Sequence, residues 1–345
     1  MTDATASATA KGRVLVVGAT GFIGQFVTEA SLNSGHPTYI LVRPSSATAN
    51  PSKTKIIKTF QAKGAIVLHG VINENELMEK LLKEHEIDTV ISAVGGEKIL
   101  DQLSLIHAIN AVGTIKRFLP SEFGHDVDRS NPVQPGLNMY KEKRLIRRTI
   151  EQLGLPYTYI CCNSVASWPY HDNHHPSLAL PPLDQIPIYG DGSVKAYFVA
   201  GADIGKFTMK TVDDLRTLDK LVHFRPSCNF YNMNELAALW EMKIERSIPR
   251  VTVTEDHLLS AAAENCIPQS VVASFTHDIF IKGCQVDFSI DGPHEVEVSS
   301  LYPEEPFISL DDCFNDFAAK LREEKGKETA PRPVVEPLPI TATCA

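Results

Sequence analysis

Short apolar runs alternate with longer amphipathic stretches through the first half of the chain. The helical stretches show apolar residues at helical spacing, as in the face of Ile99, Leu103, Ile106 and Ile109, which Gly113 ends. Alternating strands and helices of this length predict an α/β fold with a doubly wound parallel sheet, covered by helices on both faces. The strand candidates are Arg13–Val17, Thr38–Val42, Ala65–His69, Thr89–Ser92, Arg117–Leu119 and Tyr157–Cys161.

The pattern changes after Cys162 and becomes mixed. Ile186–Tyr189 and Val194–Val199 flank Asp191-Gly192, which predicts a hairpin with a type I′ turn. We expect Asp203 to cap a helix through Val212, and Asn232 or Asn234 to cap another through about Arg246. This half predicts a smaller mixed α/β domain, parts of which could return to the main sheet.

A glycine-rich turn joins the first strand to the first helix. Glycines in such a turn allow a tight bend, close approach of the backbone to a pyrophosphate, and packing of helix on strand. The free N–H groups and the dipole at a helix start favour the same anion. The segment therefore predicts a Rossmann-type dinucleotide site formed by Gly18, Ala19, Thr20, Gly21, Phe22, Ile23 and Gly24.

Arg43 at the end of the second strand indicates which dinucleotide is bound. It lies nineteen residues after Gly24, where an NAD-preferring site would place a carboxylate for the ribose 2′-hydroxyl. Glu29, inside the first helix, is the one acidic residue between Lys11 and Asn73. Because an arginine accommodates a 2′-phosphate, NADPH is favoured over NADH. Lys53 is a second candidate for the phosphate, with ordinary surface charge as its alternative.

These features divide the chain into four parts. We expect a disordered N-terminus at 1–11, an NADP-binding Rossmann domain at 12–162, a substrate-binding region at 163–325 and a disordered, proline-containing tail at 326–345.

Composition excludes several classes of function. The net charge of −9 argues against general nucleic-acid binding, which needs a basic surface. Seven scattered cysteines without a C-x-x-C pair indicate reduced thiols in a cytoplasmic protein. No apolar stretch approaches the ~18 residues that cross a bilayer. No second cluster accompanies the histidines of 171–175, so we expect no metal site there. Nothing in the sequence demands more than a monomer.

Ligands of open parallel sheets bind beyond the carboxyl ends of the strands, so the segments after the strands are the candidate site. Ser92 and Val94 follow the fourth strand and are expected to lie beside the nicotinamide ribose. His125 lies in the loop after the fifth strand, and a histidine can exchange a proton near neutral pH. Asn163 follows the sixth strand and is expected to contact the substrate.

Lys143 is expected to open the helix after the fifth-strand loop. Tyr140, Lys143 and Arg147 share one helical face, since they are spaced i, i+3 and i+7. A lysine on a basic helix is often solvent-facing, but this helix starts at the cofactor end of the sheet. Tyr140 is a candidate for substrate binding and not for catalysis, because its spacing to Lys143 is not the Tyr-x-x-x-Lys of many short-chain dehydrogenases.

These segments resemble the isoflavone reductase-like group of atypical short-chain dehydrogenases, and within it the leucoanthocyanidin reductase family. The resemblance runs from about Lys11 to at least Tyr302 and covers the glycine turn, Arg43 and Lys143. The family's short motifs appear as Arg117-Phe118-Leu119-Pro120, Ile160-Cys161-Cys162-Asn163 and Thr276-His277-Asp278.

The resemblance implies an enzyme and names its residues. Lys143 corresponds to the active-site lysine, His125 to a histidine that joins it, and Arg147 to a basic position near the cofactor. The implied activity is NADPH-dependent removal of the C4 hydroxyl of a flavan-3,4-diol through a quinone methide, giving a catechin-type flavan-3-ol. Two alternatives remain: reduction of another phenolic benzylic ether or of an isoflavone, and a non-catalytic NADP-sensing protein.

Overall fold

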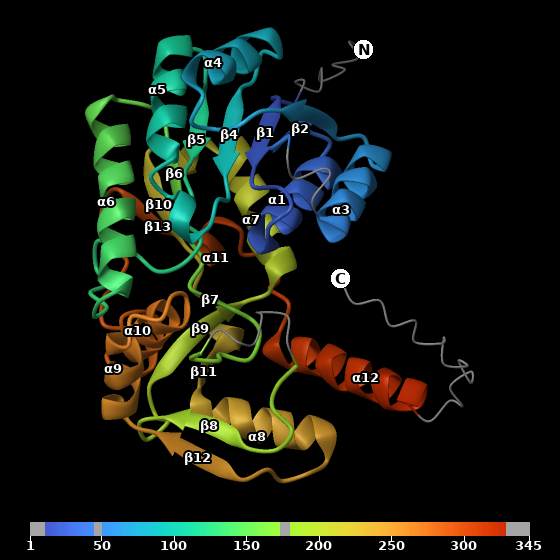
Figure 1. The fold of residues 1–345 in the computed structure, drawn as a ribbon, viewed down its shortest axis with the longest axis vertical. Helices are drawn as coiled ribbons and strands as arrows, with labels where there is room; N and C mark the ends of the chain where they lie inside the picture. The colour runs from blue at the N-terminus through green and yellow to red at the C-terminus, as the bar shows by residue number, and fades with distance from the viewer. Residues whose placement is uncertain (1–10, 45–49, 173–179, 329–345) are drawn as a thin grey trace, which may run out of the picture.

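A parallel sheet with helices on both faces forms the upper part of the molecule (Figure 1). The computed structural model describes residues 11–44, 50–172 and 180–328. The central strand of this sheet is β1, which pairs in parallel with β2 on one side and with β4 on the other. The full strand order is β3-β2-β1-β4-β5. The strands are β1 (Val14–Val17), β2 (Thr38–Val42), β3 (Ile66–His69), β4 (Thr89–Ser92) and β5 (Arg117–Leu119). The predicted doubly wound α/β class is confirmed, and each of these strands lies within one residue of its predicted bounds.

Three later strands continue the same parallel array. β6 (Thr158–Cys161), β10 (Lys220–His223) and β13 (Glu295–Glu297) pair in parallel in the order β13-β10-β6. A bridge between Phe118 and Tyr157 connects them to β5. The domain boundary at residue 162 stays a prediction.

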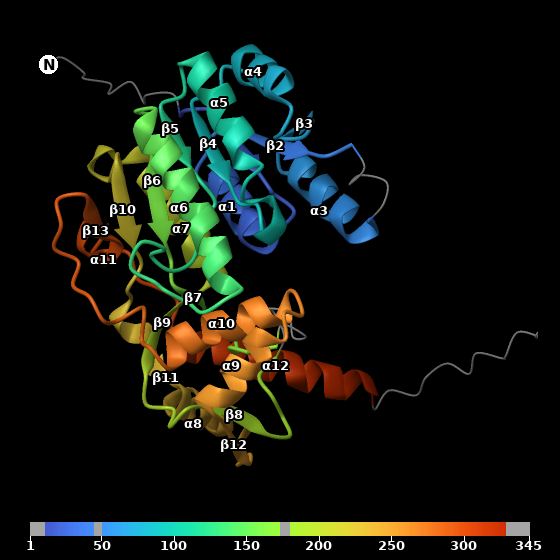
Figure 2. The same ribbon diagram turned by 60° about the vertical axis from the view of Figure 1, so that its left-hand side comes forward.

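Helices cover both faces of the sheet (Figure 2). The strands β1, β2, β4 and β5 are buried along their whole length, whereas the edge strand β3 is partly exposed. On β1, Leu15 and Val17 pack toward one set of helices, and Val14 and Val16 toward the other. The first set is α4 (Asn75–Glu84), α5 (Gln102–Val112) and α6 (Gly136–Gln152), and the second is α1 (Phe22–Asn33), α3 (Pro51–Ala62) and α7 (Gly201–Asp213).

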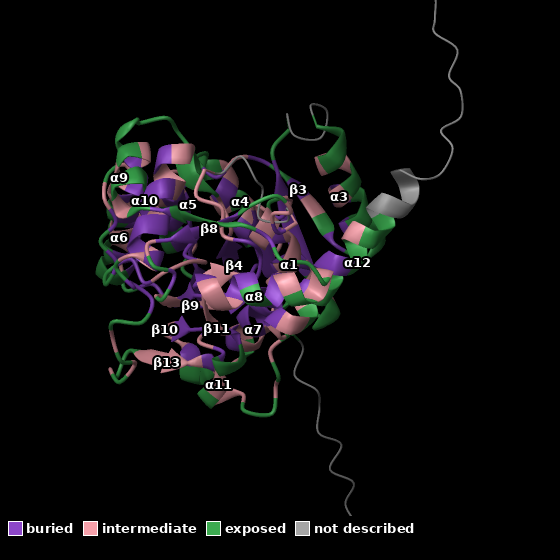
Figure 3. Ribbon diagram, turned by 90° about the horizontal axis from the view of Figure 1, so that it is seen from below, coloured by how far each residue is buried: buried purple, intermediate pink, exposed green. Residues whose placement is uncertain are grey.

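The lower part of the molecule has its own core, which includes Trp168, Trp240 and Phe314. Two small sheets build it, β11-β9-β7 and β12-β8. The strands are β7 (Ser164–Val165), β8 (Ile186–Tyr189), β9 (Lys195–Val199), β11 (Phe230–Asn232) and β12 (Arg250–Val253). The remaining helices are α8 (Met233–Ile244), α9 (Glu255–Ala263), α10 (Gln269–Phe280), α11 (Val298–Leu301) and α12 (Leu310–Glu328), with short 3₁₀ turns at η1 (Gly96–Lys98), η2 (Leu215–Thr217) and η3 (Ser227–Asn229). Seen from below, buried strands lie inside a rim of partly exposed helices (Figure 3).

The predicted hairpin over residues 186–199 is wrong. β8 pairs in parallel with β12, and β9 pairs antiparallel with β11. Asp191 does not adopt the positive φ that a type I′ turn requires, although Gly190 and Gly192 do. The carboxylate of Asp191 instead accepts hydrogen bonds from the backbone and hydroxyl of Ser193. The turn therefore sends the two strands to different sheets, which their apolar pattern could not indicate.

Helix starts are partly as predicted. Asn232 caps α8 and forms a capping box with Glu235, as predicted for one of the two asparagines. Asp203 is not a cap: α7 begins at Gly201 behind Ala200, and the Asp203 carboxylate accepts from the backbone N–H of Ile308. Lys143 lies in the middle of α6, not at its start, because the helix begins at Gly136.

Parts of some predictions fall outside the described residues. These are 1–10, 173–179 with His174 and His175, and 329–345. Of the expected tail, 326–328 belong to α12. Within the described ranges, no helix combines the length and the apolar character needed to span a membrane.

Candidate functional site

The glycine turn brings β1, α1 and β4 into close contact. Gly18 has a φ of +83°, and a Cβ there would lie 2.5 Å from the carbonyl oxygen of Ala93 in the segment after β4. A Cβ on Gly24 would lie 2.1 Å from the carbonyl oxygen of Gly18. Gly21 precedes α1 without any side-chain cap, which leaves the first N–H groups of the helix available to an anion.

A cleft of about 480 Å³ opens at this point, between the carboxyl ends of β1 and β4, where the strand order reverses. Six of the predicted cofactor residues line it: Gly18, Thr20, Gly21, Arg43, Lys53 and Val94. The other residues of the turn and Ser92 are not in its wall. Ala19 and Ser92 are buried, and Phe22, Ile23 and Gly24 belong to α1.

Sequence reasoning missed part of the cleft wall. Val71, Ile72 and Asn73 line it after β3, and Lys98 and Asp101 line it after β4. The signal was available, since all five follow strands of the parallel sheet. Val71, Ile72 and Asn73 follow the third strand, whose loop carries no motif of its own, and Lys98 and Asp101 lie further along the chain than the small residues directly after the fourth strand.

The loop after β5 lies against the wall of this cleft and carries His125. Ser121 Oγ donates to the carbonyl oxygen of Val94 (2.5 Å), and Lys143 Nζ donates to the carbonyl oxygen of Glu122 (2.6 Å). His125 and Lys143 are therefore held in the same loop–helix unit, as predicted, and both keep part of their surface accessible. They do not themselves line the cleft that holds Gly18 and Arg43.

Burial shifts the pKa values of both side chains toward their uncharged forms. Desolvation, with a smaller contribution from the Lys143 charge, lowers the pKa of His125 to about 4. Desolvation also lowers the pKa of Lys143, and the nearby Glu122 carboxylate opposes that shift. At neutral pH His125 is a neutral imidazole, and Lys143 loses its proton more readily than a lysine in water.

The low pKa of His125 predicts an acid-sensitive fold. The unfolded chain binds a proton at this histidine below about pH 6.5, and the folded chain only below about pH 4. Stability therefore falls as pH decreases from about 6.5 to 4, and between pH 7 and 5 the penalty is about 2 kcal/mol. We expect His125→Asn to lose less unfolding free energy than wild type over that interval, measured by urea titration. His107→Asn, a change at an exposed histidine of α5, is the control. Equal acid sensitivity of both variants and wild type would contradict the low pKa of His125 as a cause of acid sensitivity.

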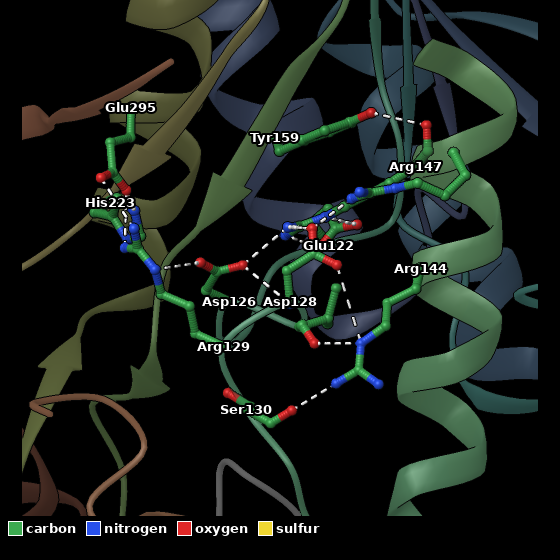
Figure 4. Close-up of polar contacts among 12 residues, drawn as sticks. Glu122, Asp126, Asp128, Arg129, Ser130, Arg144, Arg147, Tyr159, His223 and Glu295 are labelled. Atoms are coloured by element: carbon green, nitrogen blue, oxygen red, sulfur yellow. Dashed lines mark hydrogen bonds and ion pairs between the residues drawn. The ribbon is translucent and has the colours of Figure 1, made fainter. Parts of the chain in front are cut away.

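Arg147 lies in a buried ion cluster and not in the cleft (Figure 4). Its guanidinium bonds both oxygens of Glu122 (2.9 and 3.1 Å) and one oxygen of Asp126 (2.9 Å). It also contacts Asp128 (3.1 Å) and stacks over the ring of Tyr159. Its side chain is only 2% exposed. Arg147, predicted to contact the cofactor, therefore anchors the loop that carries His125. It does so through Glu122, which precedes His125 in the chain, and through Asp126, which follows it.

The predicted substrate contacts are engaged within the protein. Asn163 has a φ of +58° and its amide donates to the carbonyl oxygen of Phe224 (2.9 Å). The Tyr140 hydroxyl bonds Nδ1 of His125 (2.5 Å). Cys161 and Cys162 are buried, and desolvation raises the pKa of the Cys162 thiol to about 12, which makes it a poor nucleophile.

The remaining motif residues hold elements together. Arg117 is buried and donates to Thr158, Thr217 and the backbone of α7. His277, in α10, bonds Glu255 at the start of α9 (2.9 Å). In the part of the chain that the structure describes, no group of three or more His, Cys, Asp or Glu side chains could hold a metal ion.

Comparison with known proteins gives consistent matches along the chain. Residues 10–312 match the model of the NmrA-like family. A leucoanthocyanidin reductase from Desmodium uncinatum is 66% identical over 91% of this chain and 82% of its own. A phenylcoumaran benzylic ether reductase from Ginkgo biloba is 45% identical over 89% of this chain and 99% of its own. Among solved structures, the binary complex of leucoanthocyanidin reductase with NADPH from Vitis vinifera has a TM-score of 0.86 and 67% identity, over 89% of this chain and 100% of the other.

Proposed function

This chain belongs to the NmrA-like family, in its isoflavone reductase-like group, and from that membership we propose that it removes the C4 hydroxyl of a flavan-3,4-diol. It is an NADPH-dependent reductase of the leucoanthocyanidin reductase type. The observation that carries the substrate assignment is 66% identity to leucoanthocyanidin reductase against 45% to a phenylcoumaran benzylic ether reductase.

The cleft has the features that NADPH requires. The uncapped start of α1 offers N–H groups to the pyrophosphate, and the absence of a Cβ at Gly21 leaves room for it. Arg43 and Lys53 in the cleft wall offer positive charge to the 2′-phosphate. Bound there, NADPH supplies a hydride to the substrate.

Arg43→Ala is expected to weaken NADPH binding about 10- to 100-fold, the loss expected for charge-assisted hydrogen bonds to a phosphate. Binding of NADH, which lacks the phosphate, should change less than about twofold. Calorimetric titration of both dinucleotides measures the difference. Lys58→Ala, an exposed change on α3, is the matched control. Equal losses for NADPH and NADH would show that Arg43 does not recognise the 2′-phosphate.

The chemistry of the substrate requires proton transfer as well as hydride transfer. Hydroxide leaves poorly, so direct displacement at C4 would be slow. Loss of a phenolic proton together with departure of the C4 hydroxyl as water gives a quinone methide, which is electrophilic at C4. One hydride and one proton enter overall, and one water leaves.

His125 and Lys143 are the groups to which we assign the proton transfers. Lys143 acts as the base toward the phenol, which its lowered pKa supports. His125 acts at the C4 hydroxyl and at the water that this hydroxyl becomes. The placement of the two residues supports the assignment. His125 lies in the 121–125 loop, which Ser121 ties to the segment after β4, and Lys143 donates to the same loop at the carbonyl oxygen of Glu122.

A panel of phenolics tests the substrate. We expect NADPH oxidation with leucocyanidin and at least about tenfold lower kcat/KM with a phenylcoumaran, a lignan or an isoflavone. Preference for one of the latter would contradict the assignment and leave the cofactor unchanged. NADPH binding without turnover of any of them would favour the non-catalytic NADP-sensing alternative.

We further propose that the protein works as a cytoplasmic monomer. The support comes from the sequence: seven scattered cysteines without a C-x-x-C pair fit the reduced thiols of a cytoplasmic protein, and nothing in the sequence demands more than a monomer.

A further inference from the structure

Tyr140 contacts the imidazole of His125, and the contact is short. Its hydroxyl lies 2.5 Å from Nδ1 of the imidazole. Tyr140 is 4% exposed, so water does not compete freely for this hydroxyl. Burial raises the pKa of the phenol well above its usual value, so Tyr140 keeps its proton at neutral pH.

The direction of this hydrogen bond follows from the available acceptors. Among the described residues, Nδ1 of His125 is the one atom within hydrogen-bonding distance of the Tyr140 hydroxyl. The phenol therefore donates its proton to Nδ1, which must be unprotonated to accept it. Since the imidazole is neutral, its own proton resides on Nε2.

An aromatic contact holds this pair in place. The Tyr140 ring stacks on Phe275 of α10, with centroids 4.8 Å apart and planes 25° apart. The edge of His125 meets the same phenylalanine, at 6.5 Å and 69°. The start of α6 is fixed to α10 by a hydrogen bond from the Gly136 N–H to Ser274 Oγ (3.1 Å). The Tyr140 hydroxyl thus has little freedom to turn to another acceptor.

We infer that Tyr140 is a positioning residue that fixes His125 in the Nε2-protonated tautomer, so that His125 holds the departing C4 hydroxyl through its Nε2–H as a neutral hydrogen-bond donor and not as a base. The proton that converts this hydroxyl to water is the one that Lys143 takes from the phenol. The inference rests on the proposed function for the identity of the C4 hydroxyl. A neutral imidazole with a fixed tautomer is an established way to present an N–H to a reacting oxygen. It leaves Lys143 as the base of the pair.

Nitrogen NMR of full-length protein labelled at the histidine rings tests the tautomer at pH 7.5, with and without NADPH. His125→Gln identifies the His125 resonances by their loss. We expect wild type to show an unprotonated Nδ1 and a protonated Nε2, and Tyr140→Phe to shift both resonances toward the average of two tautomers. A proton on Nδ1 in wild type, or unchanged resonances in Tyr140→Phe, would overturn the inference. The wild-type spectrum decides even where the variant fails to fold.

Kinetics give a second readout of the same variant. Tyr140→Phe keeps the stack on Phe275, and we expect kcat to fall about 3- to 10-fold with KM within about twofold, as for loss of one hydrogen bond. Tyr197→Phe is the control, since Tyr197 stacks on Phe230 in the same way and takes no part in the Tyr140–His125 hydrogen bond. A raised KM with unchanged kcat would mean that Tyr140 binds substrate, which overturns the inference. If wild type turns over no flavan-3,4-diol, the proposed function fails and the NMR result alone decides the tautomer.

Discussion

Replacing Lys143 by alanine is expected to lower kcat with leucocyanidin about 10²- to 10⁴-fold, the range for loss of one general acid–base group. The methyl side chain cannot take the phenolic proton, so the quinone methide forms slowly. NADPH affinity should be nearly unchanged, because Lys143 does not line the cofactor cleft. Single-turnover traces with NADPH deuterated at the transferred position measure the effect on the chemical step.

Two comparisons make this prediction specific. Lys141→Ala removes an exposed lysine two residues earlier on α6 and should leave kcat within about twofold of wild type. The Lys143 variant should also lose most of its deuterium isotope effect, since formation of the quinone methide becomes rate-limiting. Unchanged turnover in both Lys143→Ala and His125→Ala would rule out the proposed proton transfers.

Arg147→Met is expected to cost about 3–5 kcal/mol of unfolding free energy, the loss typical when one partner of a buried ion pair is removed. Methionine fills much of the volume but leaves the carboxylates of Glu122 and Asp126 without a counterion. Both are nearly inaccessible, with 2% and 4% of their side chains exposed. Urea unfolding at pH 7.5 measures the difference.

Arg148→Met is the matched control on the same helix. Arg148 also bonds Asp128, but it is 57% exposed, so its loss should cost less than about 1 kcal/mol. If Arg147→Met were as stable as wild type and bound NADPH weakly, Arg147 would act on the cofactor, as its sequence position first indicated, and the anchoring role would be wrong.

Much of the upper fold could be predicted because its central strands are buried on both faces. Val14, Leu15, Val16 and Val17 are all inaccessible, which gives a continuous apolar run that alternates with helices. The glycine turn was equally informative, since contacts at Gly18 and Gly24 exclude any side chain. Local residue type therefore determined both the class of fold and the position of the nucleotide cleft.

The predictions that were wrong or missing concern contacts between segments distant in sequence. The strand at 186–189 pairs with one more than sixty residues later, and nothing in its own pattern selects that partner. Arg147 shares a helical face with Lys143, but its carboxylate partners lie in the 122–128 loop, whose path a sequence does not give. The role of Tyr140 depends in the same way on a hydroxyl whose acceptor lies fifteen residues back.

Product analysis with deuterated NADPH tests the central claim most directly. The protein is incubated with leucocyanidin and NADPH that carries deuterium at the transferred position of the nicotinamide, and the flavonoid product is examined by NMR. The expected product is a catechin-type flavan-3-ol with one deuterium at C4. A product without deuterium at C4, or oxidation of NADPH without any flavan-3-ol, would contradict hydride transfer to a C4 quinone methide.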